Sequence, residues 1–242
     1  MFQSLQTLLH FLVPYPCPCC KKFLDENEKG ICSSCLSKIR WIEPPFCSVC
    51  GVPFLSPELE NHTCGSCLLR KRPFQRARAL GYYEGTLRLA IHQWKYQEKA
   101  SLTSFFGEKM VEGFYRYWSP SEIDLLLPVP LHPNRLRERG FNQSLLLVKT
   151  LSHRTGIPYQ KRLLQKINPT PPLMELRAAE RERVIKGSFR LVKKEEIAGK
   201  SILLVDDVYT TGATVSECAK VLLAGGATRV DVFTLAHAIK GF

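Results

Sequence analysis

The sequence predicts an α/β protein with a parallel sheet, preceded by a small cysteine-rich domain. Nine of the ten cysteines lie in the first 67 residues. After about residue 74, continuous apolar runs alternate with segments of helical periodicity, which is typical of a parallel sheet with helices on both faces. We therefore divide the 242 residues into an N-terminal domain at 1–72 and a larger domain at 73–242.

The composition is that of a globular protein, with 45% hydrophobic and 23% charged residues. No apolar run reaches the roughly 18 residues that a membrane span needs. The first residues, MFQSLQTLLHFLVPYP, lack the basic start and the cleavage site of a signal peptide. We expect them to form an amphipathic helix that docks on the body, and we expect a cytoplasmic protein with no membrane span.

The cysteines of the first domain form four C-x-x-C pairs. The pairs, separated by 11, 11 and 13 residues, are Cys17 and Cys20, Cys32 and Cys35, Cys47 and Cys50, and Cys64 and Cys67. One pair presents two thiolates from a tight turn, and two pairs complete a closed four-sulfur zinc site. Sequential pairing is the simplest arrangement and predicts two structural Zn²⁺ ions, although an interleaved cross-brace fits the same spacing. Cys19 is left over.

The second domain alternates strands and helices. Strands are expected at 77–83, 124–130, 201–207 and 229–238, and helices at 87–96, 101–117, 140–156 and 214–227. Gly156 and the Gly225–Gly226 pair stand where two of these helices should end. The segment 157–190 interrupts this alternation of strands and helices, and it contains three prolines between Asn168 and Leu173. There we expect a loop followed by a charged helix.

The stretch ILLVDDVYTTGAT at 202–214 places two carboxylates at the end of a strand, directly before a Thr/Gly turn and a helix start. Ligands of open α/β sheets bind at such strand ends. The N–H groups of the turn and the helix dipole attract a phosphate. Asp206 and Asp207 then suit ribose hydroxyls or the water around a Mg²⁺. We expect the ligand, rather than the protein, to compensate their charge. The residues expected to cradle the phosphate are Thr210, Thr211, Gly212, Ala213 and Thr214.

This stretch resembles the phosphoribosyl pyrophosphate (PRPP) motif of the type I phosphoribosyltransferases, from which Tyr209 departs. Three further segments narrow the resemblance: PVPLHPNRLRERGFNQS at 128–144, WKY at 94–96 and ERERVIKGSF at 180–189. Together with the cysteine pairs they resemble the ComF family, phosphoribosyltransferase-like proteins of bacterial DNA uptake, over about residues 10–240. The resemblance implies a type I phosphoribosyltransferase-like domain behind a double zinc ribbon.

The resemblance also implies roles for individual residues. PRPP and Mg²⁺ would bind with the ribose hydroxyls on Asp206 and Asp207. The 5′-phosphate would lie on Val208, Tyr209, Thr210, Thr211, Gly212, Ala213 and Thr214. Pyrophosphate would be stabilised by Lys95, Arg137 and Arg139, the arginines being carried by a mobile loop next to Asn142 and Gln143, two further PRPP contacts. The side chain of Tyr209 would cap or narrow the base side. Whether the protein turns PRPP over, and onto which acceptor, stays open.

The charge distribution supports a second hypothesis. The net charge is +12, and residues 132–194 hold 15 basic and 4 acidic residues. Because a basic groove tracks a phosphate backbone, the chain can instead be a non-catalytic competence protein that retains the pocket. Its partners would be single-stranded DNA, a helicase or a channel, with Phe141, Tyr159 and Phe189 as stacking candidates. A third hypothesis is a regulator that senses PRPP without consuming it.

Overall fold

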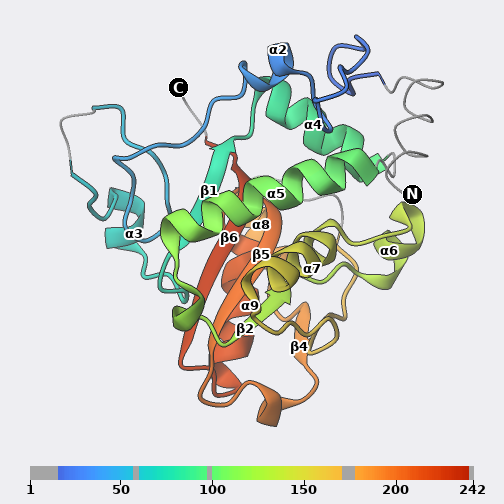
Figure 1. Cartoon of the computed structure of the whole chain (residues 1–242). Helices are drawn as coiled ribbons and strands as arrows, with labels where there is room; N and C mark the ends of the chain where they lie inside the picture. The colour runs from blue at the N-terminus through green and yellow to red at the C-terminus, as the bar shows by residue number, and fades with distance from the viewer. Residues whose placement is uncertain (1–15, 57–59, 97–99, 171–177, 240–242) are drawn as a thin grey trace.

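The computed structural model describes residues 16–56, 60–96, 100–170 and 178–239 (Figure 1). The helix expected at the N-terminus lies outside the described residues. None of the helices in these ranges combines the length and the apolar composition that a membrane span requires.

Four parallel strands form the main sheet, as the sequence predicts. Their order is β1 (Ala77–Tyr82), β6 (Arg229–His237), β5 (Ser201–Tyr209) and β2 (Leu125–Pro128). The two central strands are the longest, and most of their residues are buried. All four strands run the same way, so their carboxyl ends meet at one edge, where β5 delivers Asp206 and Asp207.

Helices cover both faces of the sheet. The first face carries α4 (Gly85–Tyr96), α5 (Ala100–Tyr117) and α7 (Gln143–Thr155), and the second carries α8 (Ala178–Ile185) and α9 (Ala213–Ala224). Figure 1 shows α5 and α7 in front of the sheet. Alternation along β5 separates two cores: Leu203 and Val205 pack into the first, Ile202 and Leu204 into the second. The predicted ends of α7 at Gly156 and α9 at Gly225 are confirmed.

The segment 157–190 contains structure that the sequence reading missed. Beside the expected charged helix α8, it forms a small antiparallel sheet from β3 (Leu164–Lys166) and β4 (Phe189–Leu191). Leu164 and Phe189 are buried in the second core, and this burial holds the two strands in place. Strands of three residues are too short to show a periodicity. Short 3₁₀ helices span Pro120–Glu122 and Lys194–Glu196.

The arginines expected on a mobile loop lie on a helix, α6 (Pro133–Arg139). His132 caps it by accepting a hydrogen bond from the Asn134 N–H at 3.2 Å. Pro133 occupies the first helical position, and Gly140 ends the helix with φ +77°. Proline at the start and glycine just past the end are ordinary helix signals. They explain why this segment is a helix, although its prolines had suggested a loop.

The cysteine-rich segment, with α2 (Ser33–Leu36) and α3 (Gly65–Leu69), packs into the body. Cys17, Cys32 and Cys35 belong to the first core, whereas Cys47, Cys50 and Cys67 belong to the second. Between the two groups the chain runs beside β1. There the Ile42 N–H donates to the Leu80 carbonyl at 2.8 Å, and the Tyr82 N–H donates to the Arg40 carbonyl at 3.0 Å. The boundary drawn at 72/73 falls between α3 and β1.

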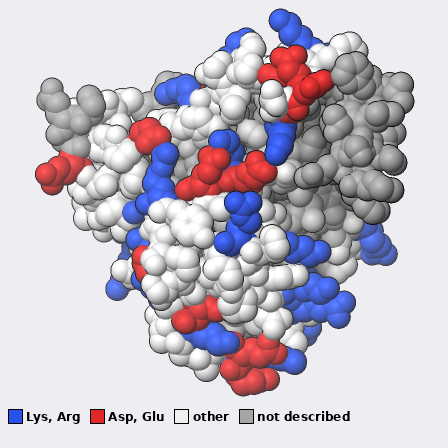
Figure 2. Space-filling model, in the orientation of Figure 1, with Lys and Arg blue, Asp and Glu red and all other residues white. Residues whose placement is uncertain are grey.

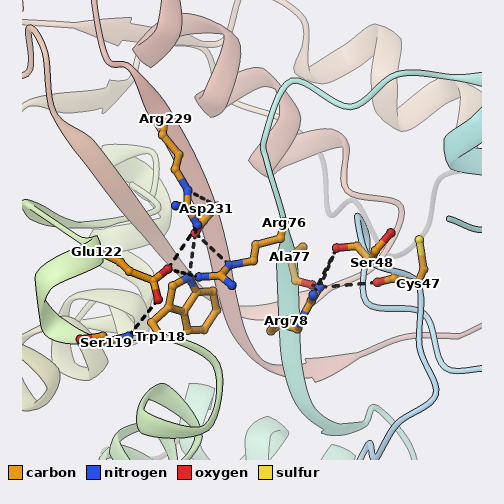
Figure 3. A network of polar contacts seen from close by, with 10 residues as sticks. All are labelled: Cys47, Ser48, Arg76, Ala77, Arg78, Trp118, Ser119, Glu122, Arg229 and Asp231. Carbon is orange, nitrogen blue, oxygen red and sulfur yellow. Dashed lines mark hydrogen bonds and ion pairs between the residues drawn. The ribbon is translucent and has the colours of Figure 1, made fainter. Parts of the chain in front are cut away.

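A buried carboxylate organises the opposite edge of the sheet (Figure 3). Asp231 of β6 is fully buried and accepts hydrogen bonds from the Trp118 indole at 2.7 Å and from Arg229 at 2.7 Å. Arg76, just before β1, donates to it at 3.2 Å. On β1 itself, Arg78 reaches the carbonyl of Ser48 at 3.1 Å. The network ties β1, β6 and the cysteine-rich segment together.

Candidate functional site

A cavity of about 460 Å³ opens at the carboxyl ends of β2 and β5. From β5, the following loop and the start of α9 it is lined by Asp206, Asp207, Val208, Thr210 and Thr214. From other elements it is lined by Lys95, Tyr96, Arg135, Arg139 and Lys166 among others. The edge of the sheet expected to bind a ligand is therefore hollowed, and residues from five separate stretches of sequence meet there.

The two carboxylates have different surroundings. The Oδ1 atom of Asp206 accepts hydrogen bonds from the Ser144 hydroxyl at 3.0 Å and from the Asp207 N–H at 2.9 Å. The Oδ2 atom of Asp207 forms an ion pair with the Lys95 ammonium at 2.9 Å. The expectation that the ligand alone compensates the acidic pair is therefore wrong, because the last turn of α4 brings a lysine to Asp207.

Asp206 titrates near neutrality. Burial raises its pKa to about 7, and the charge of Asp207 adds to the rise. The Asp207 N–H, Lys95 and the Ser144 hydroxyl oppose the rise but do not cancel it. The charge of Asp206 also acts on two neighbours: it favours a higher pKa for Lys166 on β3 and for the buried Cys218 on α9. A carboxylate with a pKa near 7 exchanges its proton easily when a cationic or hydroxyl-rich ligand arrives.

The loop after β5 turns at a glycine directly before the start of α9. Gly212 has φ +76° and precedes the first residue of α9, Ala213, whose N–H approaches the Thr211 hydroxyl oxygen at 3.4 Å. A Cβ at position 212 would collide with the Tyr209 ring, so glycine is required both for the conformation and for space. Thr210 and Thr214 line the cavity with the helix N-terminus behind them.

The side chain of Tyr209 does not face the cavity. It is 4% exposed, and its ring lies in the second core, 4.5 Å from the His237 ring centroid and 6.4 Å from that of Phe74. Burial raises the pKa of its hydroxyl. The expectation that this side chain caps or narrows the base side is therefore wrong. Tyr209 instead supports the loop from beneath.

The arginine and amide residues of the predicted site are only partly brought together. Arg139 lines the cavity, lies 5.7 Å from the Tyr96 ring centroid and donates to the Oε1 atom of the Gln143 side chain at 3.4 Å. Arg137 instead donates to the Asn134 side chain at 2.6 Å and is absent from the lining. Arg137 and Arg139 are two residues apart, which corresponds to a rotation of about 200° around the helix axis. Arg137 therefore lies on the opposite side of α6 from Arg139.

Asn142 and Gln143 support the site from outside the cavity. The Asn142 side chain caps α7 by accepting from the Leu145 N–H at 3.3 Å, and it donates to the Val129 carbonyl at 3.0 Å. Gln143 is 1% exposed. Both residues fix the start of α7, which presents Ser144 to Asp206.

Sequence reasoning missed three polar residues of the site. Ser144, which contacts Asp206, closes the GFNQS motif, so its place at a helix start after a capping asparagine was a usable signal. Lys166 and Thr170 line the cavity, and their side chains hydrogen-bond at 2.7 Å. Burial lowers the pKa of Lys166. No signal pointed to this pair, because it lies in the segment interpreted as a loop.

The eight predicted zinc ligands form two separate clusters. Cys17, Cys20, Cys32 and Cys35 make the first, and Cys47, Cys50, Cys64 and Cys67 make the second, with all sulfurs of a cluster within 4.8 Å of one another. The Sγ atoms of Cys20 and Cys32 are 3.5 Å apart and those of Cys50 and Cys64 are 3.7 Å apart. A tetrahedral Zn–S₄ site with bonds of about 2.3 Å has edges of about 3.8 Å, so both clusters fit zinc.

This arrangement confirms the sequential pairing and excludes the cross-brace. Four cysteines would fill each coordination sphere and leave no position for water or substrate, which is typical of structural zinc. Cys19 stands outside the first cluster, with its sulfur 3.8 Å from the Thr86 carbonyl. The second cluster is also linked to the loop after β5. Arg72 lies beside the Cys67 side chain and donates to the Thr211 carbonyl at 3.4 Å.

The sheet, the loop after β5 and the two cysteine clusters define a zinc-ribbon protein with a phosphoribosyltransferase domain. Residues 8–68 match the double zinc ribbon domain family, and residues 153–241 match the phosphoribosyl transferase domain family. The chain is 32% identical over 230 residues to the DNA utilization protein YhgH of Salmonella typhimurium, covering 94% of this chain and 99% of that protein. It belongs to the ComF/YhgH family.

Two further relatives carry competence names. Competence protein F of Haemophilus influenzae is 30% identical over 230 residues, covering 93% of this chain and 97% of that protein. Competence protein ComFC of Bacillus subtilis is 28% identical over 220 residues, covering 88% and 86%. Among solved structures, the glutamine PRPP amidotransferase from B. subtilis is 21% identical with a TM-score of 0.39, covering 59% of this chain and 30% of that one.

Proposed function

We propose that this protein binds PRPP, or a related phosphorylated ribose, together with Mg²⁺ in the cavity at the end of β5. The observation that carries the proposal is the order of groups along that edge. Two carboxylates, one of them with a pKa near 7, stand directly before a glycine-capped phosphate cradle. The phosphoribosyltransferase domain of the family supports the same ligand class.

The donor set fits the two parts of such a ligand. No hydrogen bond or ion pair among the described residues uses Oδ2 of Asp206 or Oδ1 of Asp207. These oxygens would accept ribose hydroxyls and contact the water shell of Mg²⁺, an ion that prefers oxygen ligands. The 5′-phosphate would lie on the N–H groups and hydroxyls of the loop from Thr210 to Thr214.

Cations across the cavity suit pyrophosphate. Lys95, Arg139 and Lys166 all line it. Lys95 pairs with Asp207 and would exchange this partner for a phosphate oxygen. If phosphoribosyl is transferred, these cations would stabilise the departing pyrophosphate while the aspartates favour a cationic ribose. Arg137 does not line the cavity. It could contact pyrophosphate only if α6 moved.

Calorimetric titration of the zinc-loaded protein with PRPP and Mg²⁺ tests the proposal. We expect binding that weakens at least about a hundredfold in the Asp206→Asn, Asp207→Asn variant, because two charged hydrogen-bonding partners are lost. The matched control is Glu195→Gln, Glu196→Gln, an adjacent acidic pair on the 3₁₀ helix Lys194–Glu196. Absence of heat from folded wild-type protein would rule the proposal out.

PRPP binding should also depend on pH through Asp206. Below pH 7 this carboxyl is protonated in the free protein, and the proton must leave before the group accepts ribose hydroxyls beside Mg²⁺. With a pKa of about 7, affinity should fall about tenfold between pH 8 and pH 6, with one proton released per ligand at the lower pH. Titrations in buffers of different ionisation enthalpy measure that proton. The Asp206→Asn variant should lose the release, and a wild-type protein that releases none would contradict this assignment.

We place the protein in competence or DNA utilization because its relatives bear those names. The second candidate, a single-stranded DNA-binding protein that retains the pocket, draws on the basic segment 132–194. Its predicted stacking residues are poorly placed: Phe189 is 5% exposed, and Phe141 and Tyr159 pack against the first core. In Figure 2 basic and acidic side chains are interspersed on the visible face. DNA binding that falls steeply with salt and survives loss of Asp206 and Asp207 would favour this second candidate.

A further inference from the structure

A second hollow lies behind the phosphate loop, and we call it the α8–α9 groove. Its volume is about 430 Å³, within the range of about 300–1,000 Å³ that small-molecule sites occupy. Its walls come from the chain after α3, from α8 and from α9. The charged residues that line it are Arg70, Lys71, Arg72, Glu182, Arg183, Lys186, Glu217 and Lys220. Six of these eight are basic, so the groove is strongly cationic.

Both carboxylates of the groove are already occupied by the protein. Glu182 of α8 accepts two hydrogen bonds from the Arg70 guanidinium, at 2.6 and 2.5 Å. Glu217 of α9 accepts from the Gly187 N–H at 2.8 Å and from the Lys220 ammonium at 3.3 Å. These contacts tie the three walls together, and they leave neither acid to neutralise the other cations.

Three cations therefore remain unmatched. Among the described residues, Lys71, Arg183 and Lys186 form no ion pair with a carboxylate. Arg72 lies beside Cys67 of the second cluster, but its Nε atom is enclosed without a hydrogen-bond partner in the described part of the chain. The Ser216 hydroxyl, on the α9 wall, is in the same situation. Like charges gathered around a concave surface repel one another unless an anion enters.

We propose that the α8–α9 groove binds an oligophosphate group, either free or as the phosphate tail of a nucleotide. Arginine and lysine side chains on three walls can contact several phosphate oxygens at once, which favours a chain of phosphates over a single carboxylate. The groove lies next to the loop after β5. Ala213, the first residue of α9 after that loop, lines the groove, and Arg72 donates to the Thr211 carbonyl of the loop. The two sites are nevertheless separate, since none of the groove's charged residues lines the cavity of Asp206.

The test uses the full, zinc-loaded chain and inorganic tripolyphosphate, titrated by calorimetry at low salt without Mg²⁺. The Arg183→Gln, Lys186→Gln variant should bind at least about tenfold more weakly, because two charge-assisted contacts are lost. The matched control, Lys149→Gln, Arg154→Gln, removes the same charge from exposed positions of α7 and should bind like wild type. Equal affinities in all three proteins would overturn the proposal.

Hydrogen exchange locates the bound anion. Tripolyphosphate should protect backbone amides of α8 and the first turn of α9, in the Asp206→Asn, Asp207→Asn variant as well as in wild type. Protection confined to residues around the acidic cavity would overturn the groove as the site. If PRPP fails to bind while tripolyphosphate protects α8, the groove stands and only the proposed function falls. Titration with ATP separates the sources, because a nucleotide site should bind ATP more tightly than inorganic tripolyphosphate.

Discussion

Replacing Cys47 by serine is expected to release one of two zinc ions and to unfold much of the protein. Cys47 is fully buried in the second core, and its sulfur accepts the N–H groups of Cys50 at 3.4 Å and Cys64 at 3.3 Å. Structural zinc contributes about 10–16 kcal/mol of binding free energy in zinc-finger peptides. Whole domains are stable by only about 5–15 kcal/mol. The core that holds Cys47 is therefore not expected to survive without the metal.

Elemental analysis and thermal unfolding measure both parts of this result. Wild type should contain about two zinc ions per chain, as its two clusters require. The Cys19→Ser variant is the matched control, since Cys19 belongs to neither cluster, and it should keep both ions and the wild-type unfolding temperature. A Cys47→Ser protein with two zinc ions and unchanged unfolding, or a wild type with less than one, would contradict the assignment.

The second large effect is expected at Asp231. In the Asp231→Asn variant the side chain keeps its size but loses its charge, while Arg76 and Arg229 stay beside the fully buried position. Breaking a buried ion pair by removing one partner costs about 3–5 kcal/mol. We expect a loss of this order in the free energy of unfolding, measured by urea denaturation. The cavity lies at the other edge of the sheet, so ligand affinity of the folded variant should not change.

Glu122 provides the comparison for Asp231. It pairs with the same two arginines, but its side chain is 37% exposed. Solvent screens such a pair, so Glu122→Gln should cost about 1 kcal/mol or less. A similar loss for both variants would show that burial does not set the contribution of this network, and a negligible loss at Asp231 would remove its structural role.

Much of the fold was predictable because its long elements bury continuous apolar stretches. Strand β5 runs through Leu203, Leu204 and Val205 into the acidic pair. Apolar runs of this kind, alternating with helical segments, indicated a parallel sheet, and the acidic pair indicated a site at the strand end. The cysteine spacing likewise predicted both clusters, since each C-x-x-C pair fixes two ligands locally. These features depend on residues close together in sequence.

The rest depended on contacts between distant residues. Nothing near Lys95 in the sequence shows that it will meet Asp207, and nothing near Lys166 shows that it will line the same cavity. The direction of Tyr209 was set by the space that Phe74 and His237 leave in the second core. For α6 the sequence did contain helix signals, namely Pro133 at the start and Gly140 at the end. The three prolines at 128, 130 and 133 nevertheless led to the prediction of a loop.

The hydrogen bonds between the segment at Arg40–Ile42 and β1 have a further consequence. β1 is the outermost strand of the sheet beside β6, and its other side carries backbone groups that would otherwise be bare. An uncovered edge strand is a template for pairing with another chain and promotes aggregation. The stretch that joins the two zinc clusters thus shields the edge as well as connecting metal sites. Cutting the chain at 72/73 would leave a body prone to self-association.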